Sequence, residues 1–147
     1  MSQVPRMFSV DEANALVPQL QLELAQVAKL RGELTAAIEA LGGADTAVAI
    51  LHKGAPAPAG REAEAAELKG LASRIQEIVN RIVSMGAIVK DLEAGLVDFY
   101  SVRDGEPVFL CWQLGEPSIA HWHAVDEGFA GRQPIEGVEY ELPQYPN

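Results

Sequence analysis

The stretch AHWHAVDEGFAGRQP, near the C-terminal end of the chain, gathers two histidines, a tryptophan, two acids and an arginine. His121 and His123 are two residues apart, and on a β-strand this spacing places both imidazole rings on one face. Imidazole nitrogens and carboxylate oxygens are ligands of iron, manganese and zinc. The pattern therefore predicts a transition-metal site whose ligands are drawn from His123, His121, Glu93, Asp98 and Asp126.

Cys111 is a further soft ligand for this site if the strand that carries it meets the histidine face. A register slip of one residue would bring Trp112 to that face instead, and the sequence leaves both registers open. In the first register His121 could serve Cys111 as the base of a nucleophilic pair. A lone cysteine in an apolar strand is more often buried and inert, so the catalytic residues stay unknown.

Arg132 follows two glycines in GFAGRQP, and its planar guanidinium group suits a carboxylate or phosphate. This arrangement predicts a binding site for a small anionic ligand. The alternative is an internal ion pair that fixes the loop, with a partner among Asp98, Glu93 and Glu127.

Two long helices are predicted to precede these residues. Ser9 and Glu12 form the pattern of a capping box, and Pro18 should kink the first helix or split off a short N-terminal turn. Gly42 and Gly43 should end that helix, and the Ala-, Pro- and Gly-rich stretch 42–60 is interpreted as a mobile connection. A second helix over 61–90 has an apolar seam at heptad spacing: Leu68, Leu71, Ile75, Ile78, Ile82, Met85 and Val89.

After position 90 the apolar residues alternate, which is typical of strands. Strands are predicted at 97–102, 107–114 and 118–123, with a tight turn at RDGE and a weaker fourth strand at 138–142. The sequence thus predicts an α+β fold in one domain, residues 1–147. A long antiparallel helical hairpin over about 9–90 would precede an antiparallel sheet of three or four strands, a β-meander over about 96–142.

Composition limits the partners. With 11 Lys and Arg against 21 Asp and Glu, the formal net charge is -10, which disfavours nucleic acid and anionic membranes. A single cysteine and the lack of a signal-peptide pattern favour a cytoplasmic protein. A second apolar stripe on the later helix predicts a homodimer through the long helices, with packing on the sheet as the alternative: Ala72, Val79, Val83 and Ile88.

Three segments carry a family resemblance: FSVDEANALVPQL, VKDLEAGLVDFYS and VFLCWQLGEPSIAHWHAVDEGFAGRQP. Together they resemble an uncharacterised prokaryotic family, domain of unknown function 2203. The resemblance supports one compact domain and implies no activity or ligand set.

Three functions stay open at this point. The first is transition-metal binding centred on His123, in a binding or redox role. The second is a non-catalytic dimeric interaction module in which the polar cluster is a structural brace. The third is a small enzyme or binding protein for an anionic metabolite that uses Arg132 and His123.

Overall fold

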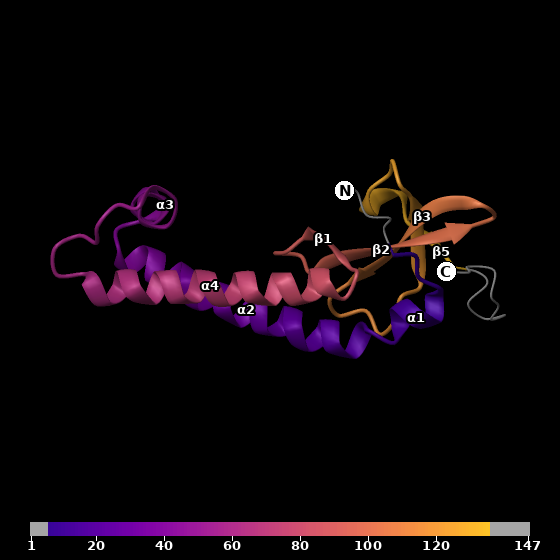
Figure 1. Cartoon of the computed structure of the whole chain (residues 1–147), viewed down its shortest axis with the longest axis horizontal. Helices are drawn as coiled ribbons and strands as arrows, with labels where there is room; N and C mark the ends of the chain where they lie inside the picture. Colours follow the sequence, from indigo (N-terminus) through magenta and orange to yellow (C-terminus); the bar gives the residue numbers. More distant parts are fainter. Residues whose placement is uncertain (1–5, 136–147) are drawn as a thin grey trace. The chain divides into compact units, whose positions relative to one another are not determined.

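A computed structural model describes residues 6–135 of the chain (Figure 1). The chain divides into two compact units, one made of residues 1–24 and 81–147 and the other of residues 25–80. Both long helices run from one unit into the other, so each unit is described by itself. The sheet and all the predicted metal ligands belong to the first unit.

The N-terminal helical region is split as the sequence predicts. Helix α1 (Val10–Asn14) begins at a complete capping box between Ser9 and Glu12, and α2 (Val17–Ala40) follows it. Pro18 is the second residue of α2, where a missing backbone N–H leaves no hydrogen bond unmade. Pro18 therefore costs α2 little stability.

The connection predicted to be irregular over 42–60 contains a helix, α3 (Ala44–Lys53). Ala47 and Ile50 are three residues apart on α3 and both are buried, so a short apolar face stabilises a segment whose composition resembles a loop. Gly54 ends α3 in the left-handed conformation. The prediction of an unstructured connection is therefore wrong for residues 44–53.

The unit of residues 25–80 is helical. It contains the later part of α2, all of α3, and most of α4 (Glu62–Ser84). Its core consists of aliphatic side chains from these three helices and from the turn after α2: Val27, Leu30, Ala37, Leu41, Ala47, Ile50, Ala65, Leu68, Leu71 and Ile78.

Helix α4 ends at Ser84, six residues before the predicted end. Gly86 has φ +99° and lies so close to the Phe8 ring that an added Cβ would stand 2.7 Å from Phe8 Cζ. Only glycine adopts this turn without strain. The chain then enters strand β1 (Ile88–Asp91), so the last part of the predicted helical seam belongs to the sheet.

The sheet has five antiparallel strands in chain order, more than the three or four predicted. The additional strands within residues 6–135 are β1 and the two-residue β5 (Gln133–Pro134), while the predicted strand at 138–142 lies outside the described residues. Strands β2 (Leu96–Arg103) and β3 (Glu106–Gln113) match their predictions closely, whereas β4 (His121–Ala124) begins three residues later than predicted. Asp104 and Gly105 both have positive φ and close the β2–β3 hairpin.

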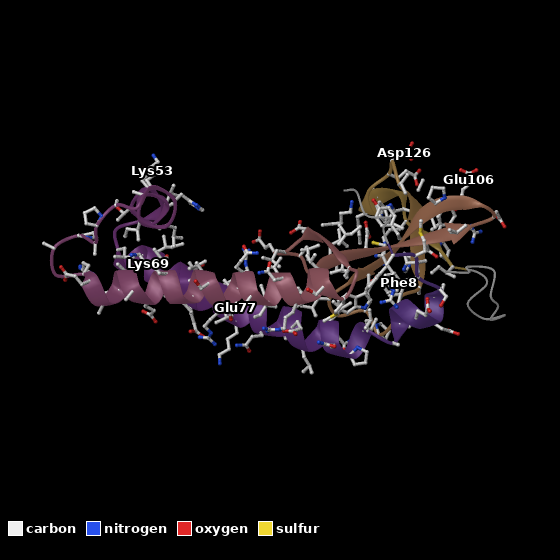
Figure 2. All side chains as sticks on the ribbon, viewed as in Figure 1. Phe8, Lys53, Lys69, Glu77, Glu106 and Asp126 are labelled. Carbon is white, nitrogen blue, oxygen red and sulfur yellow. The ribbon has the colours of Figure 1, made fainter. Side chains whose placement is uncertain are left out.

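The two faces of the sheet differ in chemistry. Phe8 packs edge-on against Phe99 with ring centroids 4.9 Å apart, and the Ser101 hydroxyl donates a hydrogen bond to the Phe8 carbonyl. Figure 2 labels Phe8 among the side chains at the sheet. Because side chains alternate along a strand, Asp98 and Cys111 lie on the opposite face from Phe99. That second face contains the polar group described below.

No single helix within residues 6–135 is both long and apolar enough to cross a membrane; α2 and α3 reach that length and composition only as a pair bent by 105°.

The second stripe on α4 is only partly covered in one chain. Ala72 and Val79 are half-buried, and Val83 is 55% exposed. Ile88, the fourth member of the stripe, lies in β1 and not in the helix. Dimerisation through the long helices stays a prediction.

Candidate metal centre

The strand register answers the question that the sequence left open. In the pairing of β3 with β4, Cys111 lies opposite His121 and Phe109 lies opposite His123. On its other side, Cys111 lies opposite Asp98 of β2. The histidine face therefore meets Cys111, and Trp112 points to the other face of the sheet.

Three adjacent strands each contribute one metal-ligand type of side chain to a single buried group. A carboxylate oxygen of Asp98, the Cys111 thiol sulfur and a ring nitrogen of His123 all lie within 4.8 Å of one another. The three residues are 1%, 0% and 2% exposed. Mutual distances of this size allow one ion to contact all three donors after small side-chain adjustments. We call Asp98, Cys111 and His123 the buried triad.

Hydrogen bonds fix the orientation of the His123 ring. Its Nδ1 lies 2.8 Å from the carbonyl oxygen of Ala124, and a carbonyl can only accept, so Nδ1 carries a proton. Nε2 then faces Asp98 Oδ2 at 3.0 Å, and a single proton lies between these two atoms. Metal-binding histidines commonly donate from the second ring nitrogen to a carbonyl in this way.

Burial controls the ionisation of the other two members. Burial raises the pKa of Asp98, although His123, a hydrogen bond from Cys111 and Lys90 act against it. Burial, assisted by the negative charge of Asp98, raises the pKa of the Cys111 thiol to about 12. The thiol is thus protonated at neutral pH without a metal, which disfavours the alternative of a Cys111 nucleophile.

One carboxylate oxygen of Asp98 is available to bind an ion. Its Oδ1 is buried and has no hydrogen-bond partner within residues 6–135, whereas Oδ2 contacts His123 and lies 3.9 Å from Lys90 Nζ. A buried oxygen without a partner is costly and is often explained by a missing ion or water.

Arg132 lies beside the triad in a second polar cluster. Its Nη2 is 2.8 Å from both carboxylate oxygens of Glu116 and 3.0 Å from Nδ1 of His121. The ion-pair partner is therefore Glu116, which stands in the turn after β3, and not one of the three acids proposed from sequence. His121 accepts from Arg132 and so belongs to this cluster and not to the triad.

The remaining predicted ligands lie elsewhere. Glu93 is exposed in the turn between β1 and β2, and Asp126 is exposed after β4. Neither is a member of the buried triad. Of the five predicted metal ligands, the structure brings together Asp98 and His123, and Cys111 joins them.

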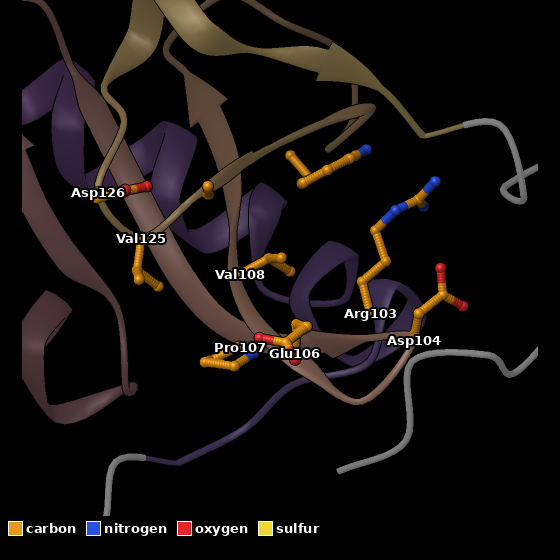
Figure 3. Close-up of a pocket in the computed structure, with 9 residues that line it drawn as sticks. Arg103, Asp104, Glu106, Pro107, Val108, Val125 and Asp126 are labelled. Atoms are coloured by element: carbon orange, nitrogen blue, oxygen red, sulfur yellow. The ribbon is translucent and has the colours of Figure 1, made fainter.

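A hollow of about 560 Å³ lies at the β2–β3 turn and the segment after β4. Figure 3 shows Arg103 and Glu106 at the turn and Val125 and Asp126 on that segment. The Arg103 guanidinium carbon stands 4.5 Å from the centre of the Trp122 ring. No member of the buried triad lines this hollow.

The fold and the triad define an α+β protein whose sheet holds a mixed oxygen, sulfur and nitrogen donor set that could bind a metal ion. The family model described as an uncharacterized conserved protein, DUF2203, matches residues 6–135, and the chain belongs to this family. This match confirms the resemblance seen in the sequence. No curated protein and no solved structure matches the chain.

Proposed function

We propose that the chain binds a transition-metal ion, Zn²⁺ in the first place, through Asp98, Cys111 and Nε2 of His123. The observation that carries this proposal is the convergence of three different donor atoms within 4.8 Å in a fully buried position. Buried ionisable groups are rare unless they are paired or bind metals.

The donor types favour zinc or ferrous iron over the harder ions. Thiolate and imidazole ligands suit Zn²⁺ and Fe²⁺, whereas Mg²⁺ and Mn²⁺ prefer oxygen donors. Three protein ligands leave one position of a tetrahedral ion open, as in catalytic zinc sites. Among the metals predicted from the sequence, manganese is therefore the least favoured.

A bound metal ion would replace the proton that burial keeps on the Cys111 thiol. A bound cation offsets the cost of a buried carboxylate and thiolate, so the Cys111 thiol must lose its proton when the ion binds. Zinc binding should therefore release protons, and zinc affinity should rise with pH.

A calorimetric zinc titration tests the proposal. We expect the wild type to bind one equivalent, with proton release seen as a dependence of the heat on the buffer. Cys111→Ala and Asp98→Asn each remove a direct ligand, so their affinity should fall by more than the roughly 10- to 100-fold that loss of an outer hydrogen-bond partner costs.

His121→Ala is the matched control, because His121 lies on the same strand and the same face as His123 but bonds Arg132. This variant should retain wild-type zinc affinity. Absence of zinc binding in the wild type would contradict the proposal, and so would an equal loss of affinity in His121→Ala.

A structural brace is the second candidate function of the triad. It is favoured by the His123–Asp98 hydrogen bond, which joins β4 to β2 without any metal. In that case zinc would not bind to any of the four proteins. The alternative that uses Arg132 as an anion site has less support, since Nη2 of Arg132 already donates to the Glu116 carboxylate.

A further inference from the structure

We propose that residues 125–132 control the exchange of metal at the buried triad, and that the ion pair between Arg132 and Glu116 holds these residues closed over it. An ion would enter or leave only after this segment opens. The inference rests on the proposed metal site and names how that site is regulated. We call residues 125–132 the cover segment.

The buried triad has no direct path to solvent. Asp98, Cys111 and His123 are each at most 2% exposed. A hydrated ion cannot reach three such donors unless part of the chain moves. Metal exchange therefore depends on a local opening of the fold, which costs less than global unfolding where few buried contacts hold a segment.

The strand lengths indicate which part opens most easily. Asp98 and Cys111 lie on β2 and β3, which pair along all eight residues of each strand. His123 lies on β4, which has four residues and pairs on its outer side with the two-residue β5. The cover segment follows β4 directly, and residues 125–130 are all exposed. This end of the triad is thus the least firmly held.

Arg132 anchors the cover segment to the neighbouring strand. Its side chain is only 11% exposed, and its Nη2 lies 2.8 Å from Glu116 in the turn after β3. The same nitrogen lies 3.5 Å from the carbonyl oxygen of Cys111. The guanidinium carbon also stands 4.4 Å from the centre of the Phe129 ring, in the short 3₁₀ helix η1 (Phe129–Gly131). One side chain therefore joins the exposed segment to β3.

The anchor lies on the same face of the sheet as the triad. Cys111 and His121 are directly opposite each other in the antiparallel pair, so their side chains share a face. Arg132 donates to Nδ1 of His121 at 3.0 Å, which places the guanidinium group on that face beside Cys111. Loss of the ion pair with Glu116 would free the covering group from the sulfur side of the triad.

A segment that must open before each exchange has a distinct kinetic effect. It slows entry and release of the ion by the same factor, so it leaves the dissociation constant unchanged. Loss of a ligand acts differently, because it weakens the dissociation constant itself. The ratio of the two rate constants therefore separates a cover from a ligand.

Stopped-flow measurements of zinc binding, and of zinc release into excess chelator, test this inference. We expect Arg132→Ala to raise both rate constants by about tenfold, because charge-assisted hydrogen bonds that hold the segment closed are lost. Its zinc dissociation constant should stay close to that of the wild type.

Two Glu→Gln variants form a matched pair of controls. Glu116→Gln removes the charge but keeps an oxygen that can accept the Gln113 N–H, so both rate constants should rise, by less than in Arg132→Ala. Glu23→Gln removes the same charge from the ion pair that Arg81 of α4 makes with α2 at 2.9 Å, and its rates should match the wild type. If Arg132→Ala does not fold, Glu116→Gln alone decides.

The outcomes distinguish the two proposals. A wild type that binds no zinc would overturn both of them. Zinc binding with equal rates in the wild type, Arg132→Ala and Glu116→Gln would overturn the cover segment and leave the metal site standing. Faster release with a matching loss of affinity would make Arg132 a support for a ligand, not a cover. Faster exchange in Lys90→Met alone would place the entry route beside β1, where Lys90 lies 3.9 Å from Asp98, and would also overturn this inference.

Discussion

Zinc should raise the free energy of unfolding of the wild-type chain by about 4 kcal/mol when free zinc is roughly 1,000 times its dissociation constant. The gain follows because the folded sheet brings Asp98, Cys111 and His123 within 4.8 Å, whereas an unfolded chain holds them apart. Urea unfolding followed by circular dichroism, with and without zinc, measures the difference.

Cys111→Ala is the informative comparison in this experiment. Alanine removes the sulfur ligand but leaves a small apolar side chain in a buried strand position. We expect this variant to unfold cooperatively and to gain little stability from zinc. Equal stabilisation of the wild type and Cys111→Ala would mean that zinc binds somewhere else.

Trp112→Ala should lower the free energy of unfolding by about 3–5 kcal/mol, the cost of removing a large buried aromatic side chain. Trp112 is among the largest fully buried side chains of the described residues, and its indole N–H donates to the carbonyl of Glu116 at 3.0 Å. The substitution leaves a cavity on the apolar face of the sheet and an unpaired carbonyl in the turn that carries Glu116.

Trp122→Ala provides a matched control on the neighbouring strand. Trp122 is only half-buried and borders the hollow at the β2–β3 turn. Its removal should therefore cost clearly less in the same urea experiment. A loss as large as that of Trp112→Ala would show that the core of the sheet lies elsewhere.

Local signals predicted the local structure well. The Ser9 and Glu12 capping box, the break before Pro18 and the Asp104–Gly105 hairpin each depend on residues a few positions apart, and all three were confirmed. Such features need no knowledge of the rest of the fold.

Tertiary contacts overrode the pattern in two places. Met85 and Val89 continue the three-and-four spacing of α4, so the periodicity predicts a helix over the residues that form β1. The Gly86 turn against Phe8, a contact 78 positions away in the chain, decides that boundary. The sequence does not predict α3, because the apolar face of this helix is short and lies among alanines and prolines.

The sequence predicts the buried triad only in part, because its third member depends on a contact between strands. The sequence predicts His123 and Asp98, and Asp98 has a signal of its own as a charged residue between Val97 and Phe99 in an apolar strand. Whether Cys111 lies beside these two residues depends on the strand register, which periodicity does not determine. Glu93 and Asp126 are near the triad in sequence, but turns place them in solvent.

Zinc-edge X-ray absorption of the protein loaded with one equivalent of zinc tests the metal centre most directly, because it counts ligands by element. The account predicts one sulfur at about 2.3 Å and the remaining nitrogen and oxygen ligands at about 2.0–2.2 Å. The sulfur contribution should disappear in Cys111→Ala. A wild-type spectrum with only nitrogen and oxygen ligands would contradict a centre built from Asp98, Cys111 and His123.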